Sequence, residues 1–96
     1  MFTVKKIKNI KTFKNLKMLI LFENDEIRIV DFKRDVIPKN IAFKSIKNPK
    51  IFMEAKSEKS SVRWRSVDID IEASDLYDVS NVLKCPKQKL YSLLKD

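Results

Sequence analysis

Three acidic side chains at alternate positions, Asp68, Asp70 and Glu72, have a spacing that could support metal chemistry. On an extended segment alternate side chains project to one side, and carboxylate oxygens gathered there can bind Mg²⁺ or Ca²⁺. The segment lacks the glycine and the full ligand set of an EF-hand loop. We therefore favour an acidic face, solvated or paired with Lys and Arg, over a metal site.

Other catalytic chemistry lacks the residues that it needs. The chain has no His and no Gly, so it can form neither a Ser–His or Cys–His pair nor the glycine-rich loops that bind phosphates and dinucleotides. Its one cysteine, Cys85, has no second thiol or imidazole with which to hold a metal. We predict a protein that is not an enzyme and that uses no cofactor.

The same composition indicates the compartment and the size of the fold. A single cysteine excludes an internal disulfide and suits the reducing cytoplasm, and no stretch approaches the ~20 apolar residues of a transmembrane helix. The basic start lacks the apolar block of a signal peptide. We expect a cytoplasmic protein without a membrane partner, built as one domain over residues 1–80 with a helical extension over residues 81–96.

The formal charge of +8 suggests a nucleic-acid partner, although two other interpretations compete with it. Frequent Lys, Ile and Asn are typical of an AT-rich coding sequence, and lysines on an edge strand discourage pairing between sheet edges. We interpret Trp64, which stands between two arginines, as a core anchor rather than a base-stacking platform. The candidate nucleic-acid-binding residues are Lys5, Lys6, Lys8, Lys11, Arg63 and Arg65.

The elements that position these residues are organised around residues 16–32, which read as a β-hairpin. Side chains alternate across a strand, and residues 18–22 are apolar on both faces, which favours a central strand covered on two sides. Asn24 and Asp25 are expected at the turn, because both tolerate a positive φ, although a longer loop is an alternative. The sequence therefore predicts an α+β fold: a small antiparallel sheet built on this hairpin, with short helices on it and a C-terminal helix.

Further elements are expected on both sides of this hairpin. A first strand over residues 2–10 precedes it, with a bulge or an early end where the alternation breaks. Short helices are expected to open at Pro38 and at Pro49, the latter capped by Asn48, and another after Ser74 as N-cap. A second hairpin is expected over residues 52–57 and 61–65.

The end of the chain carries an apolar stripe at helical spacing. Pro86 suits the first turn of a helix, and Leu90, Leu93 and Leu94 follow at i, i+3 and i+4. We interpret this stripe as a surface that packs on the domain, with docking onto a partner as the alternative.

The chain resembles the domain-of-unknown-function family 2442, whose members carry a Phe-Glu-Asn-Gly-Glu turn between two strands, a Pro…Phe helical turn and a closing Trp-x-x-Leu-Asp-x-Asp-Ile-x-x-x-x-Leu stretch. Asp25 stands where the family has Gly, which affects the turn type. The resemblance implies a small α+β domain without an established activity; some members append a helix-turn-helix domain, and others look like partners of toxin-like proteins. The similar residues here are Phe22, Glu23, Asn24, Asp25, Glu26, Asp31, Pro49, Phe52, Trp64, Val67, Asp68, Asp70, Ile71 and Leu76.

Three functions are compatible with these features. The first is a protein-interaction module, such as an antitoxin-like partner or a homo-oligomer, that uses a sheet edge, the C-terminal stripe or opposed charged segments. The second is a nucleic-acid-binding accessory protein, whose affinity would fall steeply with salt. The third is a metal-dependent protein or enzyme that uses the acidic trio. We favour the first.

Overall fold

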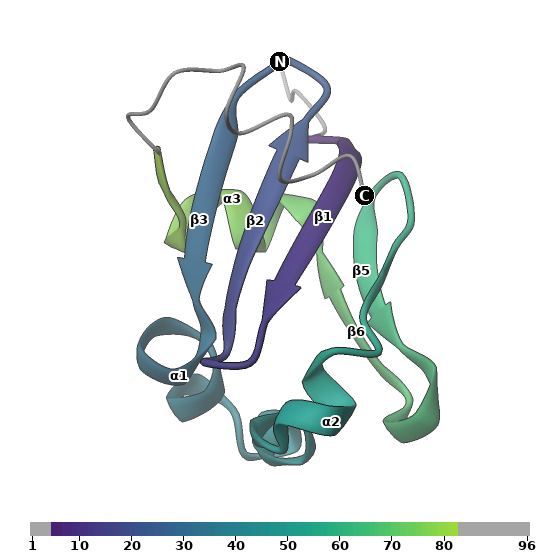
Figure 1. Ribbon diagram of the computed structural model, residues 1–96. Helices are drawn as coiled ribbons and strands as arrows, with labels where there is room; N and C mark the ends of the chain where they lie inside the picture. The colour runs from purple at the N-terminus through teal and green to yellow at the C-terminus, as the bar shows by residue number, and fades with distance from the viewer. Residues whose placement is uncertain (1–4, 83–96) are drawn as a thin grey trace.

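The computed structural model describes residues 5–82, which form the α+β fold shown in Figure 1. The strands are β1 Ile7–Phe13, β2 Lys17–Phe22, β3 Ile27–Asp31, β4 Lys56–Ser57, β5 Ser61–Trp64, β6 Ile69–Glu72 and β7 Asn81–Val82. The helices are α1 Phe32–Asp35, α2 Pro49–Phe52 and α3 Ala73–Val79, with the 3₁₀ helices η1 Ile37–Lys39, η2 Ile41–Lys47 and η3 Arg65–Val67. The predicted fold class is confirmed.

The strands form two antiparallel sheets, of which the first has the order β1-β2-β3-β7 and the second β4-β5-β6. The predicted hairpin is β2–β3, and every residue from Met18 to Phe22 is buried, as expected for a strand with two apolar faces. The second hairpin forms a sheet of its own. Residues 81 and 82, which the sequence assigns to a helical extension, add a short strand to β3, and residues 83–96 lie outside the described part of the chain.

The first strand ends later than predicted, and residues 5 and 6 precede it without strand structure. Residues 2–4 of the predicted strand lie outside the described residues. β1 covers Ile7–Phe13 rather than ending at Ile10, because its backbone pairs with β2 as far as Phe13 opposite Lys17. Pairing with a neighbour, rather than its own apolar alternation, decides its length. The expected bulge is present, since the register shifts between Ile7 and Asn9.

The β2–β3 turn is the longer alternative rather than a two-residue turn at Asn24-Asp25. The Asp25 N–H donates to the Phe22 carbonyl over 3.0 Å, and the Phe22 N–H donates to the Glu26 carbonyl over 2.9 Å. Of the two expected turn residues, Asp25 alone has a positive φ, of 69°. This is the pattern of a turn followed by one left-handed residue, which needs a single position of the kind that Gly would fill.

Three short helices between the two sheets begin at a polar side chain that caps a free N–H. Asp31 accepts from the Arg34 N–H, Asn40 from the Ala42 N–H, and Asn48 from the Lys50 N–H. The predicted helix at Asn48-Pro49 is confirmed as α2. The predicted helix at Pro38 is confirmed as η1, which has no side-chain cap. In Figure 1 α1 and α2 lie together at the end of the molecule opposite the β2–β3 turn.

The second sheet corrects two predicted boundaries. β4 begins at Lys56 rather than at residue 52, because the Asn48 cap starts a helix that runs through Phe52. α3 begins at Ala73, without a side-chain cap from Ser74. Ala73 is fully buried and its N–H donates to the Ser60 carbonyl, so tertiary contacts place the start of the helix before the expected cap.

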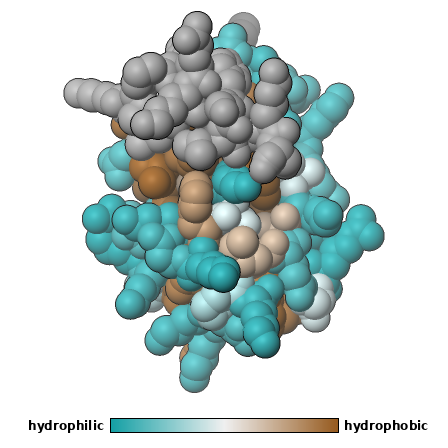
Figure 2. Space-filling view, in the orientation of Figure 1, coloured by the Kyte–Doolittle hydropathy of each residue, from teal (hydrophilic) through white to brown (hydrophobic). Residues whose placement is uncertain are grey.

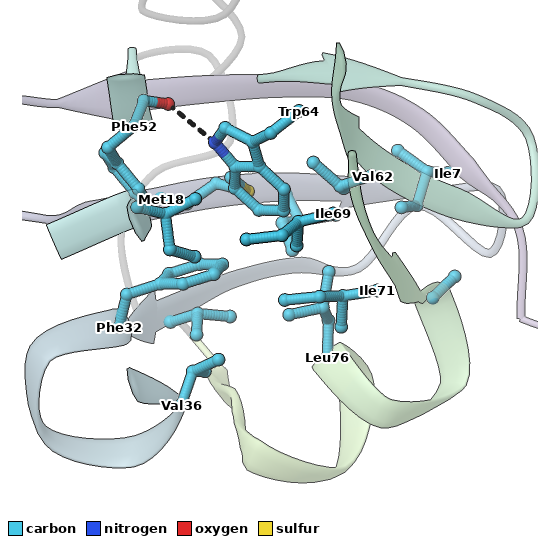
Figure 3. Close-up of a cluster of buried hydrophobic side chains, with 14 of the residues drawn as sticks. Ile7, Met18, Phe32, Val36, Phe52, Val62, Trp64, Ile69, Ile71 and Leu76 are labelled. Carbon is cyan, nitrogen blue, oxygen red and sulfur yellow. Dashed lines mark hydrogen bonds between the residues drawn. The ribbon is translucent and has the colours of Figure 1, made fainter. Parts of the chain in front are cut away.

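One hydrophobic cluster joins both sheets and the helices (Figure 3). Trp64 is fully buried, and its Nε1–H donates to the Phe52 carbonyl over 3.0 Å. Phe32 packs edge-on against both Phe52 and Trp64. The interpretation of Trp64 as a core anchor is confirmed, since a fully buried ring is not available for base stacking.

A smaller cluster lies on the opposite face of β2. It consists of Leu19, Leu21 and Ile27, with Phe13 and Ile29 packed against them. Because successive side chains alternate across β2, these residues are separated by the sheet from the cluster that contains Trp64. The central strand therefore contributes to both clusters, as its two apolar faces predict.

Candidate functional site

A groove with an apolar floor lies between the α1–η2 segment and α3. Its cavity volume is about 280 Å³. We call it the acidic groove, and its lining residues are Asp35, Val36, Lys39, Phe43, Ile71, Asp75, Leu76, Asp78 and Val79.

The floor of the acidic groove is part of the core surface. Val36, Ile71 and Leu76 are buried, and Figure 3 shows them among the core side chains. Phe43 and Val79 are half-buried and pack against the same cluster. An apolar side chain that entered the groove would therefore meet an apolar surface that is already in place.

The rim carries three carboxylates and one ammonium group. Asp75 and Asp78 are exposed on α3, whereas Asp35 lines the groove from α1 and Lys39 lines it from η1. The Arg34 guanidinium donates to Asp35 over 2.9 and 3.0 Å, and these hydrogen bonds lower the pKa of Asp35. Asp35 therefore stays ionised, and the groove can receive an apolar group that has a cation beside it.

A polar extension continues the groove past the end of α3. It shares Asp35, Lys39, Asp78 and Val79 with the acidic groove and adds Arg34, Ser80 and Asn81. The two parts together run along α3 from Phe43 to the start of β7. The apolar floor is therefore continuous with a polar stretch of the same surface.

A polar cluster that sequence reasoning missed fixes one wall of the groove. The Tyr77 hydroxyl donates to the Glu26 carboxylate over 2.9 Å, and Arg28 Nη1 donates to the same carboxylate over 2.7 Å. Arg28 Nε also donates to Ser80 Oγ over 2.6 Å, while its guanidinium lies over the Tyr77 ring, 4.1 Å from the centroid. These contacts attach the end of α3 to β3.

The charges in this cluster shift two pKa values in opposite directions. Hydrogen bonds from Arg28 and Tyr77 lower the pKa of Glu26, and the hydrogen bond to Glu26 raises the pKa of Tyr77. No local pattern signals the contact, because Tyr77 lies 51 residues from Glu26 in sequence. The sequence does place Glu26 and Arg28 on the same side of the second arm of the hairpin by alternation, and that is the one part of the cluster visible in the sequence.

The six candidate nucleic-acid-binding residues do not form one surface patch of a single element: Lys5 and Lys6 precede β1, Lys8 and Lys11 lie on β1, Arg63 lies on β5 and Arg65 lies in η3. Lys5 lies over the Tyr77 ring, 4.1 Å from its centroid, and Lys8 pairs with Asp25 over 2.9 Å. Arg63, in β5, pairs with Asp68 over 3.2 Å and with Asp70 over 3.6 Å. The exposed residues among the remaining three are Lys6 and Arg65, whereas Lys11 is half-buried on β1.

The acidic trio lies at β6, and two of its members, Asp68 and Asp70, pair with Arg63. Asp70 and Glu72 are exposed on one side of the strand, whereas Asp68 precedes it in a left-handed conformation with a φ of 55°. Asp68 and Asp70 are therefore part of an acidic face that is paired with Arg. Within residues 5–82, no three His, Cys, Asp or Glu side chains are grouped so that they could hold a metal ion.

The remaining candidate residues cannot be placed. Leu90, Leu93 and Leu94, the predicted partner-binding stripe, lie outside the described residues, as does Cys85. In the described part of the chain, no helix has the length and apolar character needed to cross a membrane.

Comparisons with protein-family models, with curated proteins and with solved structures find no match for this chain. The resemblance to family 2442 therefore stays a prediction carried by its residues. Five of those residues belong to one buried core cluster, namely Phe22, Phe52, Trp64, Ile71 and Leu76.

Proposed function

We propose that this protein is a non-enzymatic protein-interaction module whose acidic groove receives an apolar side chain flanked by Lys or Arg on a protein partner. The observation that carries the proposal is the apolar floor of the groove beneath a rim of three carboxylates, Asp35, Asp75 and Asp78. The floor selects for an apolar side chain on the partner, and the rim selects for Lys or Arg beside it. A segment that has both is favoured over one that has either alone.

The two parts of the groove would contribute differently to binding. Seating one Leu or Ile on the floor would supply about 1.5–3 kcal/mol from the apolar surface removed from water. The rim carboxylates would add specificity and a faster association with basic segments rather than a large share of the affinity. A basic partner is notable here because the chain itself has a formal charge of +8, so the attraction must come from the local field of the groove.

This proposal includes the role of an antitoxin-like partner in the cytoplasm, for which the resemblance to family 2442 and the single cysteine are the support. A second copy of the chain also fits the chemistry of the groove. Ile41, on η2, is 87 % exposed and stands between Lys39 and Lys44 in sequence. It is thus an apolar side chain with cations near it.

A titration with two small peptides tests the groove. The probe is a fluorescein-labelled peptide with one Leu between pairs of Lys, and its matched control has Ser in place of the Leu. The protein variants are Asp75→Lys with Asp78→Lys, which reverse the rim, and Glu23→Lys with Glu54→Lys, which make the same change of charge at exposed sites outside the groove.

We expect the Leu peptide to bind the native protein and to lose at least about tenfold in affinity for the rim variant, which corresponds to about 1.4 kcal/mol. The control variant should keep the native affinity, and the Ser peptide should bind weakly to all three proteins. Equal binding to both double variants, or no preference for Leu over Ser, would contradict the proposal. Sedimentation of the native protein and the rim variant over a hundredfold range of concentration shows whether the partner is a second copy.

A further inference from the structure

The helical end of the molecule gathers cations from segments that are separate in the sequence. α1, η1, η2 and α2 lie here, together with the β1–β2 turn, whose Leu16 carbonyl accepts from the Phe32 N–H over 2.9 Å. Figure 1 places α1 and α2 at this end, and Figure 2 shows hydrophilic side chains projecting from it. We call it the basic end, and its cations are Lys14, Lys17, Lys33, Arg34, Lys39, Lys44, Lys47 and Lys50.

Few acidic residues offset these cations. Asp31 caps α1, Asp35 is held by the Arg34 guanidinium, and Glu54 lies just beyond α2. Among the ion pairs formed within residues 5–82, none involves Lys33, Lys44, Lys47 or Lys50, and all four side chains are exposed. By contrast, Lys8 and Arg63, two of the residues that the sequence singled out, are paired with carboxylates.

We propose that the basic end binds the phosphate backbone of duplex nucleic acid. Exposed lysines without carboxylate partners repel one another, and a row of phosphates removes this repulsion while releasing counterions. Lysine supplies the point charges for such contacts without reading the base sequence. Arg34 and Lys39 belong to both surfaces, because they also line the acidic groove or its polar extension. The inference is independent of the proposed function because it rests on exposed lysines that do not line the groove, namely Lys33, Lys44, Lys47 and Lys50.

The apolar and aromatic residues at this end favour a duplex over a membrane or a single strand. The exposed large apolar side chains here, within the described residues, are Ile41 and Met53, and the helices are three to seven residues long. An interfacial membrane helix needs a continuous apolar face instead. Single strands are held by stacking on aromatic rings, whereas Phe43, the aromatic residue of η2, is half-buried in the acidic groove.

The test compares two triple variants with the same net charge. The first carries Lys44→Glu, Lys47→Glu and Lys50→Glu at the basic end. The control carries Lys6→Glu, Lys59→Glu and Arg65→Glu at exposed sites elsewhere, and each triple lowers the formal charge from +8 to +2. The probe is a fluorescent 20-base-pair duplex of arbitrary sequence, titrated at about 50 and 200 mM salt, and circular dichroism melts establish that all three proteins are folded.

We expect the native protein to bind the duplex with an affinity that falls steeply between the two salt concentrations. The basic-end triple should weaken binding at least about thirtyfold and flatten the plot of log affinity against log salt by about 2–3, close to one for each lost phosphate contact. The control triple should stay within about threefold of the native protein.

Three results would overturn the inference. Equal weakening by both triples would show that net charge alone attracts the duplex, and the absence of binding at 50 mM salt would show that the cations are not a nucleic-acid surface. Binding to phosphatidylserine vesicles without binding to the duplex would assign the basic end to an anionic membrane surface instead.

Discussion

Glu26 joins two segments that are distant in the chain, because its carboxylate accepts hydrogen bonds from Arg28 beside it and from Tyr77 on α3. It is a half-buried residue that immediately precedes β3. The ionised form makes these contacts, and they therefore depend on pH. The pH dependence of folding consequently reports whether the contact between β3 and α3 forms in solution.

We expect the native protein to lose stability on acidification, and we expect Glu26→Gln to lose less stability over the same pH range. Hydrogen bonds from Arg28 and Tyr77 lower the pKa of Glu26 from its ordinary value of 4.5. The ionised Glu26 side chain therefore contributes its full stabilisation of the folded state above pH 4.5, and this contribution is lost as the pH falls through the lowered pKa. Melting temperatures of both proteins between about pH 6 and pH 3 measure the difference.

The exposed Glu54 provides the control for this comparison. Glu54→Gln should follow the native curve more closely than Glu26→Gln does. If the native protein and Glu26→Gln lost stability in parallel, the contact between Glu26 and Tyr77 would not contribute to folding.

The turns of this chain are built without glycine, and left-handed backbone positions must therefore be occupied by other residues. Leu16, Asp25 and Asp68 have φ values of 65°, 69° and 55°. Asp tolerates this conformation better than most residues, whereas Leu does not. Leu16 is held there because its side chain is buried in the main cluster and its carbonyl accepts from the first residue of α1.

Two substitutions of Asp25 separate the free-energy cost of its left-handed backbone conformation from the stabilisation that its side chain contributes. Both Asp25→Ala and Asp25→Gly remove the ion pair with Lys8, which is exposed and worth about 0–1 kcal/mol. Ala also meets the steric cost of the left-handed region, and we expect it to be less stable than Gly by about 1 kcal/mol. Urea unfolding measures this difference, and equal stabilities would show that the turn has another conformation in solution.

At the scale of the whole molecule, opposite charges lie in different places. The acidic groove is bordered by carboxylates of α1 and α3, while the basic end gathers the lysines of η2 and α2. A chain whose excess of Lys arose from composition alone gives no reason for this separation. The separation is the common basis of both proposals, since each ligand would be recognised by a local field rather than by the net charge.

We expect salt to stabilise the native protein, because it screens repulsion among the cations of the basic end. The screening length falls from about 30 Å at 0.01 M to about 8 Å at 0.15 M ionic strength. The melting temperature should rise with NaCl over this range. The rise should be smaller for the triple variant Lys44→Glu, Lys47→Glu, Lys50→Glu than for the control triple with the same net charge.

This comparison has a clear contrary result. If both triples responded to salt equally, repulsion would be distributed over the whole surface rather than concentrated at the basic end. Calorimetric or circular dichroism melts at two protein concentrations keep self-association from being mistaken for a salt effect.

The sequence by itself determined the elements whose signals are local. The apolar run over residues 18–22, which covers both faces of a strand, identified the central strand, and Asn48 followed by Pro49 identified the start of α2. The bulge in β1 was likewise visible as a break in alternation. Each of these depends on backbone preferences and side-chain periodicity within a few residues, which is information that a short stretch contains.

Only the tertiary structure decided where the boundaries fall and which side chains meet. α3 starts at Ala73 because a buried contact and the Ser60 carbonyl place it there, and β4 is short because α2 runs through Phe52. The acidic groove joins residues 35–43 to residues 71–79. Which lysines have carboxylate partners also follows from the packing of segments far apart in sequence, and no local pattern encodes that packing.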